Sequence, residues 1–357
     1  MNIDRIKKIK IDFNASLLNA LKKMDLLDRK LLLVFDDINF INIISIGDIQ
    51  RALINNISID SSIKNILRKN SKLAKASDDI ELIKKRMYDF RMEIMPVIDF
   101  RGKLLNVYFW EDFFQNKNIE VQLEKQFKLP VVIMAGGRGT RLKPLTNVIP
   151  KPLIPINEKT MLEEIFDRFS VYGCKDFFIS INYKSELIKY YIENQKNDYK
   201  THYFEEDKPL GTAGSLSLLK SKIKQTFFVT NCDIIINQDY SEILDYHKKN
   251  KNDITIVAAL KHYPIPYGTI ETGKMGELIN LTEKPEITFK INSGMYILEP
   301  NLLDEIPDDT FFHITELIEK VKKRNGKVGV FPVSEKSWKD IGEWDQFIDA
   351  AINKKLK

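Results

Sequence analysis

A buried strand that runs directly into a glycine-rich loop is the feature that most constrains how this chain of 357 residues folds. Residues 131–134 are all apolar, and residues 135–142, AGGRGTRL, follow at once. A short apolar run bounded by glycine is typical of a strand buried in a parallel sheet. The N–H groups of a tight glycine turn can approach phosphate oxygens, and arginines add positive charge. The pattern therefore predicts an α/β fold with a triphosphate site after this strand.

Two familiar phosphate-binding loops do not match this segment. No Gly-Lys-Ser/Thr follows at the P-loop spacing, and Gly136, Gly137 and Gly139 are not spaced as in GxGxxG. The segment becomes specific through its continuation into PLT and then into PKP around Lys151. Because proline fixes φ, Lys151 stands on a stiff segment from which its ammonium can stabilise charge developing on a phosphate.

Apolar runs and amphipathic segments alternate through the region that follows. We expect helices over 161–171 and 185–195, and strands over 176–181 and 227–230. This alternation predicts an α/β domain with a Rossmann-like mixed, mainly parallel sheet. The last of these strands runs toward Asp233, at the carboxyl end where open α/β sheets bind ligands.

Residues 130–357 resemble the sugar-nucleotide pyrophosphorylase family of nucleotidyltransferases, because GGxGTRLxPLT, PKPLxP and the later motifs occur in the family's order. The resemblance implies a GT-A-like domain, Mg²⁺ as cofactor, and transfer of a nucleoside monophosphate from an NTP to a sugar 1-phosphate with release of pyrophosphate. The attacking phosphate is already an anion, so positioning and charge neutralisation suffice for this chemistry.

The resemblance assigns roles residue by residue. The nucleotide-binding set consists of Ala135, Gly136, Gly137, Gly139, Thr140, Arg141, Glu206, Gly211 and Thr212. The sugar-phosphate set consists of Tyr267, Gly268, Glu283, Lys284 and Asn292. Asp233 and Asp340 resemble the magnesium ligands, and the catalytic residues that neutralise phosphates are Arg141, Lys151 and Lys284. An isolated Asp or a Glu-Lys pair is usually a surface feature, so the order of the motifs is what supports these roles.

The acidic run Glu205, Glu206 and Asp207 bears on the choice of base. A carboxylate can accept from both N1–H and N2–H₂ of guanine, whereas uracil and thymine need an amide donor beside their carbonyls. Glu206 precedes Gly211 by five positions, where family members that use uracil or thymine often have Gln, and this favours GTP. A shift of one residue in the alignment would bring a neighbouring acid to the base instead.

Residues 1–120 contain two similar units, each with an amphipathic helix, an apolar strand, a turn, a second strand and a closing helix. They resemble a tandem CBS (Bateman) pair, which implies a regulatory domain that binds an adenosine nucleotide and associates into a homo-oligomer. Ser45 and Asp48 are the expected ribose contacts, although Ser and Asp are equally the residues that cap a helix. Residues 121–129 are expected to form a short helical linker.

Charge and cysteine content exclude several classes of protein. The net charge of +5 comes from 55 basic and 50 acidic residues spread along the chain, without a block that binds nucleic acid or anionic lipid. Cys174 and Cys232 are too few for a disulfide framework and lack metal-ligand spacing. No run approaches the ~20 apolar residues of a membrane span, and the basic residues at the N-terminus are not followed by the apolar stretch expected of a signal peptide. We expect a cytoplasmic protein that binds neither nucleic acid nor membrane.

Four functional hypotheses remain open. The order of domains, a CBS pair and then the transferase without a hexapeptide-repeat acyltransferase, resembles the guanylyltransferases that make GDP-glucosamine for legionaminic-type sugars, which favours glucosamine 1-phosphate. A mannose-1-phosphate guanylyltransferase and a glucose-1-phosphate thymidylyl- or uridylyltransferase would keep the same fold. The last hypothesis is a nucleotide-sensing regulatory subunit with a degenerate transferase domain, against which the retained charged residues of the motifs argue.

Overall fold

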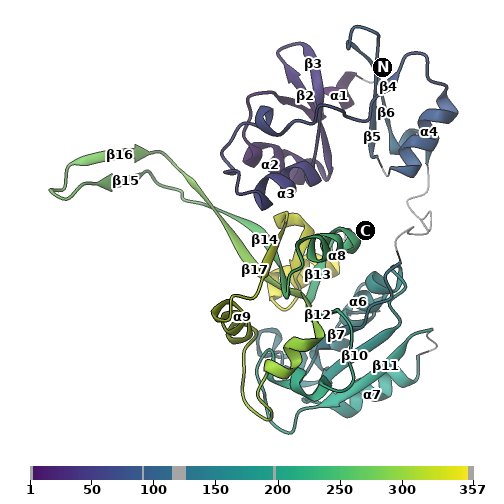
Figure 1. The fold of residues 1–357 in the computed structure, drawn as a ribbon, viewed down its shortest axis with the longest axis vertical. Helices are drawn as coiled ribbons and strands as arrows, with labels where there is room; N and C mark the ends of the chain where they lie inside the picture. The colour runs from purple at the N-terminus through teal and green to yellow at the C-terminus, as the bar shows by residue number, and fades with distance from the viewer. Residues whose placement is uncertain (1–2, 91, 115–125, 196–197, 353–357) are drawn as a thin grey trace. The chain divides into compact units, whose positions relative to one another are not determined.

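The computed structural model describes residues 3–90, 92–114, 126–195 and 198–352, and it divides the chain into two compact units, residues 1–121 and 122–357 (Figure 1). Within the described ranges, no helix is long and apolar enough to cross a membrane. The expected helical linker lies largely outside the described residues, and residues 126–130 form no helix.

Unit 1 contains two halves of one topology, as the repeated pattern in the sequence predicted. The first half has the strand order β1-β2-β3, with β1 parallel and β3 antiparallel to β2, and the second half has β4-β5-β6 in the same arrangement. The strands are β1 (Lys10–Asp12), β2 (Leu31–Asp36), β3 (Asn39–Ser45), β4 (Ala74–Lys75), β5 (Ile94–Ile98) and β6 (Leu104–Phe109). The helices are α1 (Ile3–Ile9), α2 (Leu17–Leu27), α3 (Ile46–Ile54), α4 (Ile80–Asp89) and α5 (Trp110–Phe113).

Unit 2 is built on a seven-stranded sheet of order β11-β10-β7-β12-β17-β14-β18. Its strands are β7 (Val131–Met134), β10 (Asp176–Ile181), β11 (Lys200–Glu205), β12 (Phe227–Asn231), β14 (Ile254–Pro264), β17 (Glu286–Leu298) and β18 (Val328–Val333). The pairs β11–β10, β10–β7, β7–β12 and β14–β18 are parallel. Strand β17 runs antiparallel to both of its neighbours, β12 and β14. The predicted mixed, mainly parallel α/β sheet is therefore confirmed.

Alternation along the central strands buries both faces of this sheet. Phe227 and Val229 pack on one face with residues from the segment before Phe227 and from α9 (Ile314–Lys323). Phe228, between them, contacts Phe169 of α6 (Met161–Ser170) and Tyr240 of α8 (Tyr240–Asn250) on the other face. The remaining α-helices of the unit are α7 (Ser185–Glu193) and α10 (Trp344–Ile352).

Short elements join these layers. Small two-stranded sheets form from β8 (Pro155–Ile156) with β9 (Lys159–Thr160), and from β13 (Ile234–Ile236) with β19 (Trp338–Asp340). The 3₁₀ segments are η1 (Ile63–Ile66), η2 (Thr140–Leu142), η3 (Leu145–Asn147), η4 (Lys151–Leu153), η5 (Gly214–Leu219), η6 (Pro300–Glu305) and η7 (Glu335–Ser337). The pairing of β13 with β19 brings the end of the chain back to the carboxyl end of β12.

An arm that the sequence motifs did not predict leaves the sheet of unit 2. The strands β14 and β17 stay paired from the sheet out to Pro264 and Glu286, whereas β14 pairs with β18 only up to Ala259. Beyond them β15 (Thr269–Thr272) and β16 (Leu278–Thr282) form an antiparallel hairpin. Figure 1 shows this hairpin at the outer end of the arm, away from β7, β10 and β12.

Candidate active site

The glycine-rich loop after β7 folds back onto the segment that carries Lys151. Gly139 has a φ of +62°, and a Cβ at this position would lie 2.7 Å from the Thr146 Cγ2 atom and 3.1 Å from the Lys151 Cβ atom. Only glycine fits such a left-handed, crowded position. The Thr146 hydroxyl donates to the Gly139 carbonyl at 2.9 Å, so the loop and the PLT segment hold each other in place.

Lys151 is buried, and its ammonium contacts the Asp233 carboxylate. Burial disfavours the charged amine, but the neighbouring Cys232 and the negative charge of Asp233 outweigh it, so the pKa of Lys151 is raised. The amine therefore stays protonated at neutral pH. Beneath the pair, an apolar cluster that includes Leu142, Ile154 and Ile341 fixes the three segments that meet here.

Asp340 reaches the same centre from β19, because Ile234 pairs with Asp340 in the β13–β19 sheet. Burial and then the negative charge of Asp233 raise the pKa of Asp340. Gly342 leaves room between the acidic groups, since a Cβ there would lie 2.3 Å from Asp233 Oδ2 and 3.0 Å from Asp340 Oδ1. The N–H group of Gly342 donates to Asp340 Oδ1 at 3.0 Å.

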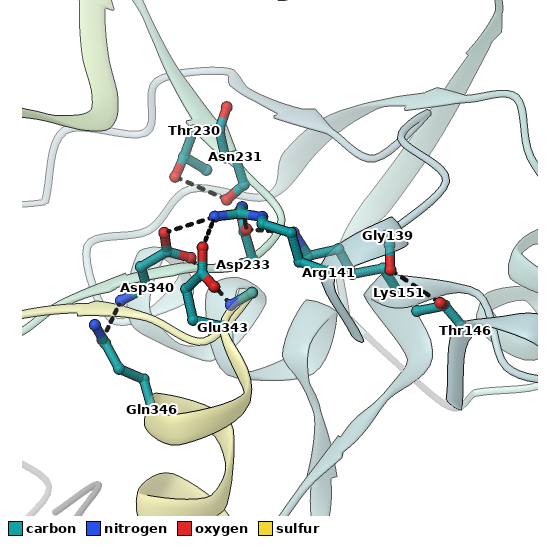
Figure 2. Close-up of polar contacts among 11 residues, drawn as sticks. Gly139, Arg141, Thr146, Lys151, Thr230, Asn231, Asp233, Asp340, Glu343 and Gln346 are labelled. Carbon is teal, nitrogen blue, oxygen red and sulfur yellow. Dashed lines mark hydrogen bonds and ion pairs between the residues drawn. The ribbon is translucent and has the colours of Figure 1, made fainter. Parts of the chain in front are cut away.

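Arg141 lies beside both aspartates of this centre, Asp233 and Asp340 (Figure 2). Its guanidinium is 3.5 Å from Asp233 Oδ2 and 3.5 Å from Asp340 Oδ2, and it also contacts the Glu343 carboxylate. Burial opposes its charge, but the bond to Glu343 and the neighbouring carboxylates outweigh burial and raise the pKa of Arg141. Two cationic side chains, Arg141 and Lys151, thus offset part of the negative charge of the three carboxylates at the centre.

The donor set at this centre fits a magnesium ion held jointly with a substrate. Mg²⁺ in nucleotide enzymes is typically bound by one or two carboxylates together with phosphates of the substrate. Asp233 and Asp340 supply such a pair, and Gly342 keeps the space between their oxygens clear. Among the described residues, no group of three or more His, Cys, Asp or Glu side chains could hold a metal ion without a substrate.

Glu206 follows β11 and lies beside the glycine-rich loop. Its Oε1 accepts from the Ser180 hydroxyl at 2.5 Å, and its Oε2 accepts from the Leu210 N–H at 3.0 Å. A Cβ on Gly136 would lie 3.2 Å from Glu206 Oε1, so the carboxylate faces the loop. Glu205 instead pairs with Lys189, and Asp207 is exposed. Of the three adjacent acids, Glu206 is the one placed beside the expected nucleotide site.

The small-residue turn at Gly211 and Thr212 packs against the segment before α9. Gly211 has a φ of +80°, and a Cβ there would lie 2.7 Å from the Phe312 carbonyl oxygen. The Thr212 hydroxyl accepts from the Ile314 N–H at 3.0 Å and lies 3.3 Å from Nδ1 of His313. Close packing on the neighbouring backbone is thus one physical reason for small residues here.

The structure does not bring the sugar-phosphate set together. Asn292 lies on β17 within the sheet, where it pairs with Ala258. The others lie on the arm, where a Cβ on Gly268 would be 2.9 Å from Glu283 Oε2. Lys284 has a φ of +46° and Tyr267 is 75% exposed. In this conformation the arm residues are separate from the centre around Lys151.

In unit 1, Ser45 and Asp48 form a capping box at the start of α3. The Ser45 hydroxyl bonds to Asp48 Oδ2 at 2.6 Å and accepts from the Asp48 N–H at 3.3 Å. Asp48 Oδ1 in turn accepts from Arg51 and Arg68. The helix-capping interpretation thus has a direct structural basis, while the ribose role remains a prediction.

Three residues that sequence reasoning missed support the site. Glu343 holds Arg141, Gly342 keeps the acidic centre open, and the fully buried Ser180 orients Glu206. Glu343 follows Asp340 by three residues in the segment WKDIGEW. Its closeness in sequence to a predicted magnesium ligand could have marked Glu343 as a site residue. Ser180 sits inside an apolar strand, and only the parallel pairing of β10 with β11 places it beside the acid.

Comparison with known proteins finds related sequences and a related fold. A mannose-1-phosphate guanylyltransferase of Arabidopsis thaliana is 31% identical over 232 residues, which cover 62% of this chain and 63% of the relative. A mannose-1-phosphate guanyltransferase of Yarrowia lipolytica is 36% identical over 184 residues, covering 49% of this chain and 50% of the relative. The chain thus spans less than two thirds of the length of these curated relatives.

The fold is also found in a crystal structure described as a glucose-1-phosphate thymidylyltransferase from Bacillus anthracis. The two chains superpose with a TM-score of 0.51 at 20% identity, over 64% of this chain and 96% of the other. The general model of nucleotidyl transferases matches residues 130–355, which include the loop, both aspartates and Lys151. The chain therefore belongs to the nucleotidyl transferase family.

Proposed function

We propose that unit 2 transfers a guanylyl group from GTP to a sugar 1-phosphate, giving a GDP-sugar and pyrophosphate. The observation that carries the proposal is the buried contact between Lys151 and Asp233, with Arg141 and Asp340 beside it at the carboxyl end of the sheet. Binding of anionic substrates at such a centre needs fixed cations next to a carboxylate pair. The retained charges argue against a degenerate regulatory subunit.

The reaction requires in-line attack of a phosphate oxygen on the α-phosphorus of the nucleotide. The glycine-rich loop would bind the triphosphate through its N–H groups, and Arg141 would neutralise the departing pyrophosphate. Lys151 would hold its proton throughout and stabilise charge on the transferring phosphoryl group. Asp233 and Asp340 would bind Mg²⁺, which when present supplies charge neutralisation and orientation of the phosphates. No side-chain nucleophile is needed.

Guanine is supported by the placement of Glu206. The carboxylate is fixed by Ser180 and the Leu210 N–H, and each oxygen retains a further lone pair for a base. An acceptor-only group matches N1–H and N2–H₂ of guanine, whereas it repels the carbonyl oxygens of uracil and thymine. The two curated relatives named above, from Arabidopsis thaliana and Yarrowia lipolytica, are also guanylyltransferases by name.

Two acceptors are the first to test. The arrangement of a CBS-like pair before the transferase favours glucosamine 1-phosphate, and the product would then serve the biosynthesis of surface glycans or nonulosonic acids. The names of the relatives favour mannose 1-phosphate. Both cysteines are free and buried, which is compatible with work in the cytoplasm.

We infer further that unit 1 is a tandem CBS pair that binds an adenosine nucleotide and regulates unit 2. Its support is the repeated topology and the position of Ser45 and Asp48 at the start of α3. A ribose at Asp48 would have to share the carboxylate with Arg51 and Arg68. Titration of AMP, ADP and ATP against the wild-type chain and Ser45→Ala would test this role.

A substrate grid tests the proposed activity. Pyrophosphate release would be measured with GTP, ATP, UTP, CTP and dTTP, each against glucosamine, mannose and glucose 1-phosphates, with Mg²⁺ present. We expect turnover with GTP and one or both of the first two sugars. Turnover with UTP or dTTP alone would contradict the assignment of guanine as the base. If no pair of nucleotide and sugar phosphate releases pyrophosphate, the result would favour the regulatory subunit.

A further inference from the structure

Two arginines of unit 1 share one buried carboxylate oxygen at the junction of β3 with α3. Asp48 Oδ1 accepts from Arg51 Nη2 at 2.5 Å and also from Arg68 Nε, so the two guanidinium groups meet at a single atom. Asp48 is 8% exposed, whereas the side chains of Arg51 and Arg68 are 56% and 48% exposed. The carboxylate therefore anchors both arginines while about half of each side chain remains open to solvent.

The segment that follows η1 places a further cation near Arg68. The Asn42 side chain on β3 donates to the Arg68 carbonyl at 2.8 Å, which ties this segment to the small sheet. The Lys72 ammonium lies over the Phe90 ring. Burial and then the positive charge of Arg68 lower the pKa of Lys72, so the two cations lie close enough to repel each other. An anion that contacts both relieves this repulsion.

Positive charge is in excess at this junction. Among the described residues, Asp48 is the only acid that forms an ion pair with Arg51 or Arg68. One carboxylate thus faces two guanidinium groups and the nearby ammonium of Lys72, an excess of about two positive charges. A phosphate group carries about −1.5 to −2 at neutral pH, which matches this excess.

The equivalent junction in the second half of unit 1, between β6 and α5, has no such excess. Its acids are Glu111 and Asp112, which stand where the first half has Gly47 and Asp48. Arg5 pairs with Asp112 at 2.6 Å, and Arg29 pairs with Glu111 at 2.8 Å. Each of these arginines has a carboxylate of its own. The repeat therefore provides an internal comparison in which only the first junction keeps cations available for an anion.

The first junction also keeps space beside its arginines. A Cβ on Gly47 would lie 3.4 Å from Arg51 Nη1 and 3.8 Å from Arg51 Nη2. A longer side chain at this position, such as the Glu111 of the second half, would lie against the guanidinium of Arg51 and supply it with a carboxylate. Glycine leaves that side of the arginine uncovered.

We propose that the junction of β3 with α3 binds a phosphate group through Arg51, Arg68 and Lys72. The planar fork of each guanidinium matches two phosphate oxygens, and the ammonium adds a point charge. In this arrangement Asp48 serves as the anchor of the arginines. The inference deepens the proposed regulatory role of unit 1, because it assigns the phosphate of the ligand, and it is independent of the transferase reaction. A nucleotide and inorganic phosphate both carry this group, and the experiment separates them.

Calorimetry on the full chain tests the site with inorganic phosphate, AMP and adenosine as probes. EDTA is present throughout, so that no Mg²⁺ supports phosphate binding at the acidic centre of unit 2. We expect phosphate or AMP to bind, and adenosine to bind at least about tenfold more weakly than AMP. AMP that binds more tightly than phosphate identifies a nucleotide as the ligand, and equal affinities identify free phosphate. Adenosine that binds as tightly as AMP overturns the phosphate site.

Single replacements locate the binding within the chain. Arg51→Met and Arg68→Met each leave Asp48 paired with the other arginine, so the buried carboxylate keeps a partner. We expect each to weaken the probe that binds wild type by about fivefold or more, because charge-assisted hydrogen bonds to the anion are lost. Lys69→Met removes the same charge from an exposed neighbour of Arg68 and should bind as wild type does. Wild-type affinity in both arginine variants overturns the site.

The outcome is separable from that of the transferase proposal. A wild-type chain that releases pyrophosphate in the substrate grid but binds neither phosphate nor AMP in EDTA overturns the phosphate site and leaves the transferase intact. A chain that is inactive in the grid, and whose binding of phosphate or AMP is weakened by Arg68→Met but not by Lys69→Met, supports the site without the transferase.

Discussion

Lys151 and Asp233 form a buried ion pair at the carboxyl end of β12, with relative exposures of 9% and 5%. Removing one partner of such a pair leaves an uncompensated charge in the interior, which is strongly destabilising. The pair therefore ties the proline-flanked segment of Lys151 to the sheet. It also presents a fixed cation and a carboxylate where a nucleotide would enter.

Replacing Asp233 by Asn should abolish most turnover. The amide retains the shape of the side chain and can accept from Lys151, but it lacks the charge that binds a metal with the substrate. We expect pyrophosphate release with Mg²⁺ to fall by about 10²-fold or more. Asp309→Asn, on an exposed side chain, is the matched control and should behave as wild type. Unchanged turnover in Asp233→Asn would refute the metal assignment.

Arg141 should compete with a metal ion for the acidic centre. Its guanidinium lies 3.5 Å from both Asp233 and Asp340, so Arg141→Met removes a competing cation from both. We expect Mn²⁺, measured by calorimetry without nucleotide, to bind about two- to fivefold more tightly, because partly exposed ion pairs contribute up to ~1 kcal/mol. Turnover should nevertheless fall, since Arg141 is assigned to the triphosphate.

Arg138→Met serves as the control for this experiment, because Arg138 is an exposed arginine of the same loop. Its replacement should leave the affinity for Mn²⁺ unchanged. Equal affinities in Arg141→Met and wild type would show that Arg141 does not restrict access to the aspartates.

Much of the acidic centre could be predicted from the sequence because its parts lie in compact local motifs. Asp233 follows an apolar strand, and Lys151 stands between prolines, so each motif indicates its own chemistry. The pairing of β13 with β19 then brings Asp340 to Asp233, although the two residues lie far apart in the sequence. Local patterns do not specify such pairings, so only the order of the motifs indicated that the two acids meet.

The arm could not be predicted in the same way. Alternation in TIETGKMGELINLT indicates strands and a turn, but it does not say whether the hairpin folds onto its own sheet or extends from it. Tertiary contacts decide that choice. For this reason Glu283 and Lys284 were expected in one pocket with Asn292, whereas the structure places Asn292 on β17 within the sheet and the other two residues before β17 begins.

Glu206 should determine the choice of base. Glu206→Gln keeps the size of the side chain but adds an amide donor, so we expect kcat/KM for GTP to fall and the ratio of UTP to GTP use to rise by about tenfold or more. Glu205→Gln, at the neighbouring acid that pairs with Lys189, should leave the ratio unchanged. If Glu205→Gln shifts the ratio and Glu206→Gln does not, the neighbouring acid contacts the base.

Asp340→Asn should stabilise the metal-free protein at neutral pH. Burial and the charge of Asp233 raise the pKa of Asp340 in the folded state above its unfolded value, so the ionised group opposes folding. This cost is fully present above the folded-state pKa and disappears as pH falls below the unfolded one, because the carboxyl group is then protonated in both states. The Tm of Asp340→Asn, measured in EDTA, should therefore exceed that of wild type at pH about 7.5, and the difference should shrink toward pH about 4. A difference that is constant across this range, or that grows as pH falls, would show that the charge of Asp340 is not what opposes folding.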